Sequence, residues 1–481
     1  MTTHPDSVAL AKPAPEGGRF NRQRSAGVII TILVLIEIIS AFETSMVYAA
    51  IPTMIRDLHS DAATVGWAVT AFLLVAAASA AVCGRLGDMY GRERVLVVIL
   101  AAAMIGSAIS ALGDSINMVI IGRAIQGVAG AILPLCIGLA REHLPKAKVP
   151  VAVAIISGSA VAAGAASAFI AGLMIDNASW HMIFVVSAVY AAFMLLLVLF
   201  VLPWRPPVGT TQNIDYVGAI AFAPAIAAVL LGITKSGTWG WTDIKTLGLI
   251  VGGSAVLALW VFWELRVPDP IANVRLMTDR KISFTTLATL TLAAGPFGIS
   301  AMVVALVLQA PTNAPFGLGL SPTAAGALTL VAALFGFACT PLSGRLSRTM
   351  GARVPLLIGT AVFGLGSVLL VAFHDTVIGM FVVVVSVSIG SAFSYTALPN
   401  LIVEAVPAEN TSEASGLNAV VRTGGQGIGT SIATMVLAGS AVAGVSTVSG
   451  LNMVAAIMLV GTALTIVLTL PIRRGSSYTE A

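Results

Sequence analysis

The sequence predicts an all-α integral membrane protein with fourteen transmembrane helices, arranged as two pseudo-symmetric six-helix bundles plus two inserted linker helices. Three observations predict this class. Of the 481 residues 58% are hydrophobic and only 10% are charged, whereas a soluble globular chain is roughly 25% charged. The apolar residues form long continuous runs. Finally, one short loop pattern occurs twice, starting at Gly84 and again 260 residues later at Gly344.

The apolar runs are each long enough to cross a bilayer, which takes about 20 helical residues. Backbone groups inside lipid must pair within the protein, so only helices or closed barrels span membranes, and runs without alternation favour helices. The predicted spans cover residues 28–51, 63–83, 95–113, 116–140, 150–175, 181–203, 216–234, 246–265, 282–309, 322–343, 354–373, 376–399, 414–439 and 449–470.

The repeated loop divides the chain. GRLGDMYGRERVL (Gly84 to Leu96) and GRLSRTMGARVPL (Gly344 to Leu356) both read G-R-L-x-x-x-x-G and occupy equivalent places between spans. Such internal repeats are typical of transporters, which bind substrate between the two halves; the alternative is chance recurrence of common loop residues. The predicted parts are a cytoplasmic tail (1–27), a six-helix bundle (28–203), two inserted helices (204–281), a second six-helix bundle (282–472) and a cytoplasmic tail (473–481).

Basic residues predict the orientation, because loops rich in Lys and Arg stay cytoplasmic. With the N-terminus inside, only Arg56, Lys235 and Lys245 fall in outer loops, and Arg123 and Arg422 lie within spans. We therefore expect a multi-pass protein of the cell (inner or plasma) membrane with both termini in the cytoplasm. The net charge of +4 follows from this topology and does not indicate nucleic-acid binding.

The first 25 residues are polar, with a basic end like the flank of a signal peptide, but a long apolar run and further spans follow, which favours a retained first helix. The cysteines Cys83, Cys136 and Cys339 fall in or at the edges of spans. We expect them to be packing residues, and the histidines lack the spacing of a metal site.

Three motifs resemble a known family. GRLGDMYGRERVL resembles the loop signature of the major facilitator superfamily, G-x-L-a-D-r-x-G-r-[kr], and IGRAIQGVAGA resembles its fourth-helix motif, R-x-x-q-G. FETSMVYAAIP is similar to the first-helix motif of the fourteen-helix drug/proton antiporter branch, L-D-x-T-v-x-n-v-A-l-P, with Glu43 where Asp is usual. The matching residues of the first two motifs are Gly84, Leu86, Asp88, Gly91 and Arg92, then Arg123, Gln126 and Gly127. With the number of spans, the resemblance covers essentially the entire chain.

The fifth span departs from the antiporter pattern. The branch usually carries a Gly-Pro pair followed by Gly-Gly, whereas SGSAVAAGAASAFIAG (Ser157 to Gly172) has Gly164 followed by Ala165 and no proline. Small residues still allow close helix packing, but the departure leaves uptake by symport open beside antiport.

Two glutamates, Glu37 and Glu43, lie in the first span, where an ionisable side chain costs about 2.5–3.5 kcal/mol and is by default a functional hypothesis. Being six residues apart, they are separated by ~9 Å along the helix and ~120° around it. We expect Glu43, on the family motif, to couple transport to protons, and Glu37 either to meet a cationic substrate or to support the proton route. The alternative is a carboxyl fixed by a hydrogen bond to a neighbouring helix.

Arg123 lies in the fourth span, which contains no acidic residue. A buried guanidinium needs a partner, and Glu37 and Glu43 are the candidates. Protonation would break such a pair and couple the proton to helix movement; the alternative is that Arg123 bonds backbone carbonyls and stabilises the fold. Arg422, near the start of the thirteenth span, is expected to extend to the cytoplasmic surface.

The loop residues Gly84, Asp88, Gly91 and Arg92 are predicted to form a conformational latch. We place Asp88 near the start of the third span, where a helix N-terminus favours a carboxylate that can bond arginines. The latch would hold the inner helix ends together in the outward-open state. Arg348 replaces Asp88 in the second copy, which therefore cannot form the same network. The alternative is a cytoplasmic anchor without a gating role.

Aromatic residues inside spans, Phe42, Tyr48, Trp67 and Tyr395, are the candidates for an apolar substrate pocket, although span aromatics also face lipid or neighbours. The sequence thus predicts a proton-coupled secondary transporter that exports small, largely apolar organic compounds by alternating access, as in multidrug efflux and drug resistance. Its expected partners are a small-molecule substrate, protons and the lipid bilayer, and we expect it to work as a monomer without a cofactor, driven by the proton gradient.

The sequence leaves one alternative open and gives no support to three other function classes. A proton symporter that imports a specific metabolite is the first alternative. A membrane-embedded enzyme would need a metal set or a nucleophile–base pair within the spans, and a sensor or scaffold would need a soluble output domain. The glycines around Gly425 are not a phosphate loop, because no GK[ST] follows them, so an ATP-driven pump is not indicated.

Overall fold

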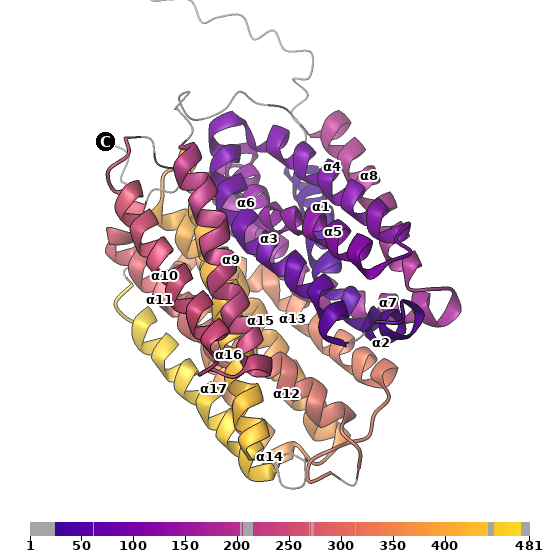
Figure 1. Ribbon diagram of the computed structural model, residues 1–481. Coiled ribbons are helices and arrows are strands. Elements are labelled where there is room, and N and C mark those ends of the chain that lie inside the picture. The colour runs from indigo at the N-terminus through magenta and orange to yellow at the C-terminus, as the bar shows by residue number, and fades with distance from the viewer. Residues whose placement is uncertain are drawn as a thin grey trace, which may run out of the picture.

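The computed structural model describes residues 25–60, 62–202, 204, 215–268, 270, 274–312, 314–440 and 447–472, and the secondary structure in these ranges is helical, without a β-strand (Figure 1). The first part of the chain forms α1 (Ala26–Ser45), α2 (Val47–Asp57), α3 (Ala62–Tyr90), α4 (Arg92–Ala111), α5 (Ile116–Gln126), η1 (Gly127–Ala131), α6 (Ile132–His143), η2 (Lys146–Lys148), α7 (Val149–Asn177) and α8 (His181–Val201). Next come α9 (Tyr216–Trp239), α10 (Ile244–Glu264) and η3 (Val274–Thr278). The last part forms α11 (Arg280–Leu292), η4 (Ala293–Phe297), α12 (Gly298–Gln309), α13 (Pro322–Met350), α14 (Arg353–Phe373), α15 (Val377–Ala405), η5 (Ala408–Asn410), α16 (Thr411–Gly439) and α17 (Val448–Thr469).

In the described ranges, 12 helical segments are long and apolar enough to cross a membrane, which confirms a multi-pass helical protein. The predicted count of fourteen is not supported by this criterion. The two remaining runs coincide with α9 and α16. In α9 only Ile220–Ile233 forms a described apolar stretch, and α16 carries Glu413, Arg422 and several glycines, which lower its hydropathy.

Three predicted spans are interrupted helices. The first is α1 and α2, which meet at Met46, and the fourth is α5 and α6 with a 3₁₀ turn between them. The ninth contains a π-helical turn at Ala293–Phe297. Pro296 explains this break, because proline has no N–H and its ring clashes with the preceding turn.

The two copies of the repeated loop end the preceding helix in the same way. The helices α3 and α13 both continue beyond the predicted span ends and stop before Gly91 and Gly351, whose φ angles are 103° and 87°. Side chains other than glycine rarely adopt these angles, so each glycine ends its helix. The pair is 260 residues apart, the same spacing as the sequence repeat.

Buried apolar residues form separate clusters in the first and last parts of the chain. One cluster lies within residues 292–472, and two lie within residues 29–202. The two parts meet along two seams, α3 against α16 and α7 against α13. The helices α9 and α10 pair with each other, and α9 also packs against α3 and α16 (Figure 1). The exact boundaries of the two bundles stay a prediction.

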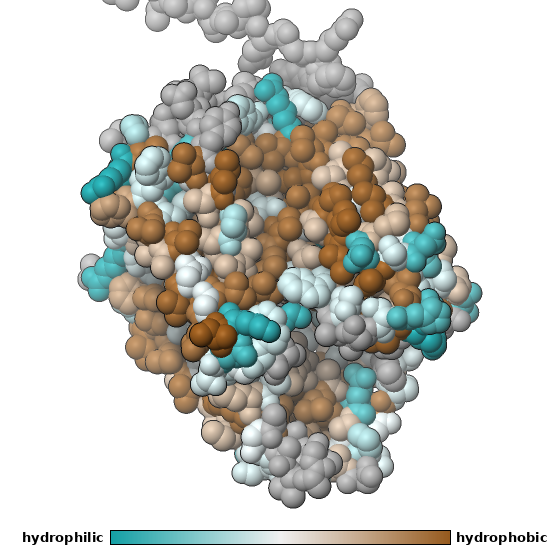
Figure 2. All heavy atoms as spheres, viewed as in Figure 1, coloured by the Kyte–Doolittle hydropathy of each residue, from teal (hydrophilic) through white to brown (hydrophobic). Residues whose placement is uncertain are grey.

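The outer surface is mainly apolar. Brown, hydrophobic residues cover most of the face in Figure 2, and teal residues form separated patches. Large apolar side chains such as Phe200, Ile244 and Ile378 are exposed on this surface. A lipid environment accounts for such exposure, because continuous apolar surface of this extent is rare on soluble proteins.

Candidate functional site

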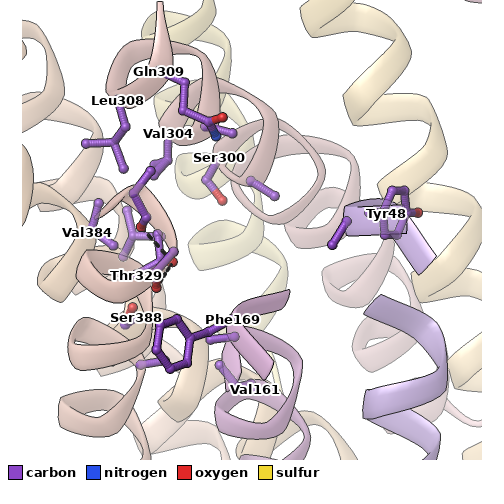
Figure 3. A pocket seen from close by; sticks show the side chains of 18 of the residues that line it. Tyr48, Val161, Phe169, Ser300, Val304, Leu308, Gln309, Thr329, Val384 and Ser388 are labelled. Carbon is purple, nitrogen blue, oxygen red and sulfur yellow. Dashed lines mark hydrogen bonds between the residues drawn. The ribbon is translucent and has the colours of Figure 1, made fainter. Parts of the chain in front are cut away.

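A cavity of about 1010 Å³ lies between the two parts of the chain. Tyr48 lines it from α2, and Val161 and Phe169 line it from α7 (Figure 3). The opposite side is formed by η4, α12, α13, α15 and α16, through residues that include Phe297, Ser300, Val304, Leu308, Gln309, Thr329, Val384, Ser388, Ser391, Tyr395 and Gln426. The cavity is large enough for a drug-sized ligand.

Glu43 lies fully buried in α1 and does not belong to the described cavity lining. Its Oε1 accepts hydrogen bonds from the Ser187 hydroxyl at 2.7 Å and the Ser107 hydroxyl at 3.1 Å. Among the described residues, its Oε2 has no hydrogen-bond partner. Three helices, α1, α4 and α8, thus meet at the Glu43 carboxyl group. Its Oε2 is the oxygen that a proton could occupy without breaking a hydrogen bond to the described residues.

Arg123 is also fully buried, but it does not form the predicted side-chain pair with a glutamate. Its Nη1 donates to the backbone oxygen of Glu43 at 2.8 Å and to Oε1 of Gln126 at 3.0 Å, and its Nε donates to the backbone oxygen of Ala68 at 3.2 Å. The guanidinium lies 4.1 Å from the centre of the Phe72 ring. Backbone carbonyls therefore supply two of the hydrogen bonds of Arg123, as expected if it stabilises the fold. Its positive charge nevertheless acts on the Glu43 carboxyl.

Gln126 connects the two groups. Its Nε2 donates to the Ser107 hydroxyl at 2.5 Å, and Ser107 in turn donates to Glu43. A chain of hydrogen bonds therefore runs from Arg123 through Gln126 and Ser107 to the carboxyl. A change of charge at Glu43 would be felt at Arg123 through this chain.

Glu37 lies elsewhere on α1, with a buried side chain whose Oε2 has no hydrogen-bond partner among the described residues. The opposite charge that acts on it is that of Arg422, from α16. The Arg422 guanidinium lies 4.4 Å from the centre of the Tyr395 ring, inside the bundle. Arg422 therefore does not extend to the surface as predicted, because an aromatic face and a carboxyl are available to it in the interior.

The predicted latch residues lie together at the α3–α16 seam. Asp88 accepts hydrogen bonds from Arg92 Nε at 2.9 Å and from the backbone N–H of Glu413 at 3.0 Å. Arg85 pairs with Glu413 at 3.1 Å. Gly84 allows this approach, since a Cβ there would lie 2.5 Å from the Ser412 carbonyl oxygen. Asp88 lies in the last turn of α3, not at a helix start as predicted, because α3 continues to Tyr90.

Arg92 ties several segments together at this seam. Its guanidinium also pairs with Glu142 at 3.0 Å and donates to the Ser412 hydroxyl at 2.9 Å and the Ala408 backbone oxygen at 2.6 Å. In the second copy of the loop, the backbone N–H of Ala352 donates to Glu404, which also pairs with Lys281. All three of these residues belong to the last part of the chain, so this second network does not join the two parts.

Two of the four predicted aromatic residues line the cavity. Tyr48 and Tyr395 face it. Phe42 packs against an apolar cluster within residues 46–184, and Trp67 is contacted by Lys235 of α9, 5.0 Å from its ring centre. The sequence did not single out Ser107, Ser187 or Glu413. Gln126, in the fourth-helix motif, was the available signal for this network.

Comparison with known proteins identifies a family of membrane transporters. The sequence profile of the Major Facilitator Superfamily matches residues 33–430 and again residues 277–479. The tetracenomycin C resistance and export protein of Streptomyces glaucescens is 27% identical over 83% of this chain and 73% of its own length. The uridine/deoxyuridine transporter of Lactococcus lactis is 28% identical over 84% and 86%. The multidrug resistance protein Stp of Mycobacterium tuberculosis is 26% identical over 82% and 72%.

Solved structures agree at the level of the fold. The human organic anion transporter MFSD10 superposes with a TM-score of 0.66 at 12% identity, covering 94% of this chain and all of that one. The proton:xylose symporter XylE gives 0.62 at 12% identity, covering 93% and 96%. These proteins are transporters and not enzymes, and the profile spans most of the sequence. The chain is therefore a membrane transporter that belongs to the Major Facilitator Superfamily.

Proposed function

We propose that this protein is a proton-coupled exporter of small, largely apolar organic compounds, of the fourteen-helix drug/proton antiporter branch. The observation that carries the proposal is Glu43, a buried carboxyl with one oxygen held by Ser187 and Ser107 and the other without a partner among the described residues. It is five residues from Tyr48 on the cavity wall. Export of tetracenomycin C and multidrug resistance among the relatives support the direction of transport.

Coupling would work through the charge of Glu43. While the carboxyl is ionised, it attracts the Arg123 guanidinium and accepts the two serine hydroxyls. A proton on Oε2 removes that charge, so Arg123 keeps only its neutral partners, Ala68, Gln126 and the Glu43 backbone. The energy of the contact between α1 and α5 therefore depends on the protonation of Glu43. The same helix α1 carries Glu37, on which the charge of Arg422 from α16 acts. No cofactor enters this scheme; the gradient drives it.

In alternating access, the latch would close one end of the cavity. Arg85, Asp88 and Arg92 of the first part bind Glu413 and Ser412 of the last part, and this network must separate before the cavity can open on that side. In the proposed topology the latch is cytoplasmic and the cavity faces outward. Export then requires the latch to open for loading and to close for release.

The branch assignment requires α9 and α16 to cross the membrane as well. At 1.5 Å per residue, the 24 residues of α9 and the 29 of α16 are long enough. The polar residues of α16 pack inside the protein: Asn418 donates to Thr289, and Ser431 donates to the backbone of Ile233. A low mean hydropathy is therefore compatible with a buried spanning helix.

The test uses purified protein in liposomes with a preset pH gradient and a pH-sensitive dye inside. Compounds are first chosen as those whose growth inhibition is relieved in cells that make the protein. Each should dissipate the gradient with wild-type protein and with Glu404→Gln, a control carboxyl in an ion pair within the last part of the chain. Glu43→Gln should abolish the response. Proton flux that is unaffected by Glu43→Gln would refute the coupling.

A second candidate is a proton symporter that imports a specific metabolite. The relative from Lactococcus lactis, a uridine/deoxyuridine transporter, is of similar identity to the exporter, and the fifth-span departure at Ala165 leaves the direction open. The same liposomes distinguish the two. A symporter accumulates substrate together with protons, whereas an antiporter accumulates it on the side from which protons leave.

A further inference from the structure

The two walls of the central cavity have different chemistry. The wall formed by α7 is apolar, with Val161, Ala165, Phe169 and Leu173 facing the cavity. The facing wall carries hydroxyl and amide groups from α12, α13, α15 and α16 (Figure 3). A molecule in the cavity therefore meets the apolar α7 surface on one side, next to Tyr48 and Thr53 of α2, and several hydrogen-bonding groups on the other.

The polar wall has unused hydrogen-bonding capacity. Within the described residues, the side chains of Ser388, Ser391, Gln426 and Tyr395 line the cavity without a hydrogen bond to the protein. The hydroxyls and the amide offer both donors and acceptors. Thr329, by contrast, already donates to backbone oxygens of its own helix, at 3.0 and 2.9 Å. The Gln309 side chain of α12 also lines the cavity without a hydrogen bond among the described residues, so it is available to a ligand beside the first four groups.

Charge is missing from the described lining. None of the described residues that line the cavity is Asp, Glu, Lys, Arg or His. Glu43 is fully buried and outside the described lining, with its bonds directed to Ser187 and Ser107. A permanently charged ligand would lose water without gaining a countercharge, and that desolvation is costly.

We infer that the cavity binds uncharged amphipathic molecules, which lie with an apolar face on Val161 and Phe169 and a hydrogen-bonding edge on Ser388, Ser391 and Gln426. Gln426 is the specificity-determining residue of these three, because its amide offers two N–H donors and a carbonyl acceptor, more than either serine hydroxyl. This inference rests on the proposed function, whose substrate class it narrows from largely apolar compounds to neutral ones with one polar edge.

The test is equilibrium binding of three fluorescent anthracene probes to the full-length protein in nanodiscs, without a pH gradient. The probes are 2-(hydroxymethyl)anthracene, its trimethylammonium analogue and 2-ethylanthracene, with empty nanodiscs as the blank. Fluorescence anisotropy should give the neutral alcohol the highest affinity, with the cation at least tenfold weaker. Equal affinities for the alcohol and the cation, or no binding of the alcohol, would overturn the inference.

Three variants locate the contacts. The double change Ser388→Ala and Ser391→Ala should lower the affinity for the alcohol roughly tenfold, because about one hydrogen bond is lost. The affinity for 2-ethylanthracene should stay the same. Ser394→Ala, on the same helix and absent from the described lining, is the matched control. Gln426→Glu places a carboxylate on the wall and should reverse the preference toward the cation.

The outcomes separate this inference from the proposed function. If Gln426→Glu leaves the probe preference unchanged, the charge argument is wrong, whatever the result of the proton-flux assay. If instead the binding preferences hold but no compound dissipates the pH gradient in liposomes, the neutral site stands and the coupling fails.

Discussion

Opening of the latch can be perturbed at one buried ion pair. Glu413 is fully buried and pairs with Arg85 at 3.1 Å across the α3–α16 seam, and its carboxylate also accepts from Asn410 at 3.2 Å. Glu413→Gln keeps the shape of the side chain and one acceptor oxygen but removes the charge. The backbone N–H of residue 413 still donates to Asp88.

The expected size of the effect follows from the bond that changes. Hydrogen bonds to charged groups contribute about 1.5–3 kcal/mol, and neutral ones about 0.5–1.5 kcal/mol. Removing the charge therefore weakens the latch by about 1.4 kcal/mol. That corresponds to roughly a tenfold increase in the population of the open-latch state.

The assay measures that minor state directly. Ser415 lies on α16 at the seam, is buried, and its hydroxyl has no hydrogen-bond partner among the described residues, so Ser415→Cys should be well tolerated. In a background without Cys83, Cys136 and Cys339, an aqueous thiol reagent reaches this position only when the seam parts. Its labelling rate should rise about tenfold with Glu413→Gln.

The control is Glu404→Gln, which weakens an ion pair of the same type within the last part of the chain, at 2.8 Å from Lys281. It should leave the labelling rate unchanged. A rate that Glu413→Gln does not increase, or that both variants increase equally, would refute the reasoning that the pair across the seam holds the latch closed.

Three further variants test the same description. Ser187→Ala removes the 2.7 Å hydrogen bond to Glu43, worth about 0.5–1.5 kcal/mol, and should lower proton-driven transport roughly three- to tenfold in the liposome assay; an unchanged rate would contradict the assigned role. Gly84→Ala places a methyl group 2.5 Å from a carbonyl oxygen of α16 and should raise labelling at the seam more than tenfold, whereas Gly66→Ala, on the same helix with nothing within 4 Å, should have no effect. Arg92→Lys cannot reproduce several of the guanidinium contacts at once, so the melting temperature should fall and the seam should open more often; a melting temperature equal to wild type would show that those contacts contribute little.

Much of the fold could be predicted because the bilayer imposes simple rules. Each predicted span coincides with a helix or an interrupted helix, since long apolar runs have no other stable conformation in lipid. The span ends at residues 83 and 343 were predicted too early, because α3 and α13 continue to the glycines Gly91 and Gly351. The predicted count of fourteen apolar spans is not supported, because a helix such as α16 can bury polar residues against other helices and then no longer looks apolar.

The site was only partly predictable, for physical reasons. Ser107 and Ser187 contact Glu43 from helices that are 64 and 144 residues away in sequence, and a serine in a span gives no signal of its own. Aromatic residues were similarly ambiguous: in a membrane helix every face is apolar, so the sequence could not tell that Tyr48 faces the cavity and Phe42 does not. The latch pairing with Glu413 required knowing that α3 lies against α16.

The two seams between the parts of the chain are held by different forces. The α3–α16 seam is crossed by the Arg85–Glu413 ion pair, whereas at the α7–α13 seam small residues come together, with Gly344 against the backbone of Val151. An ion pair loses its attraction when its carboxylate takes up a proton, whereas close packing of uncharged groups hardly responds to pH. We therefore expect a change of pH to weaken the α3–α16 seam first and to leave the α7–α13 contacts in place.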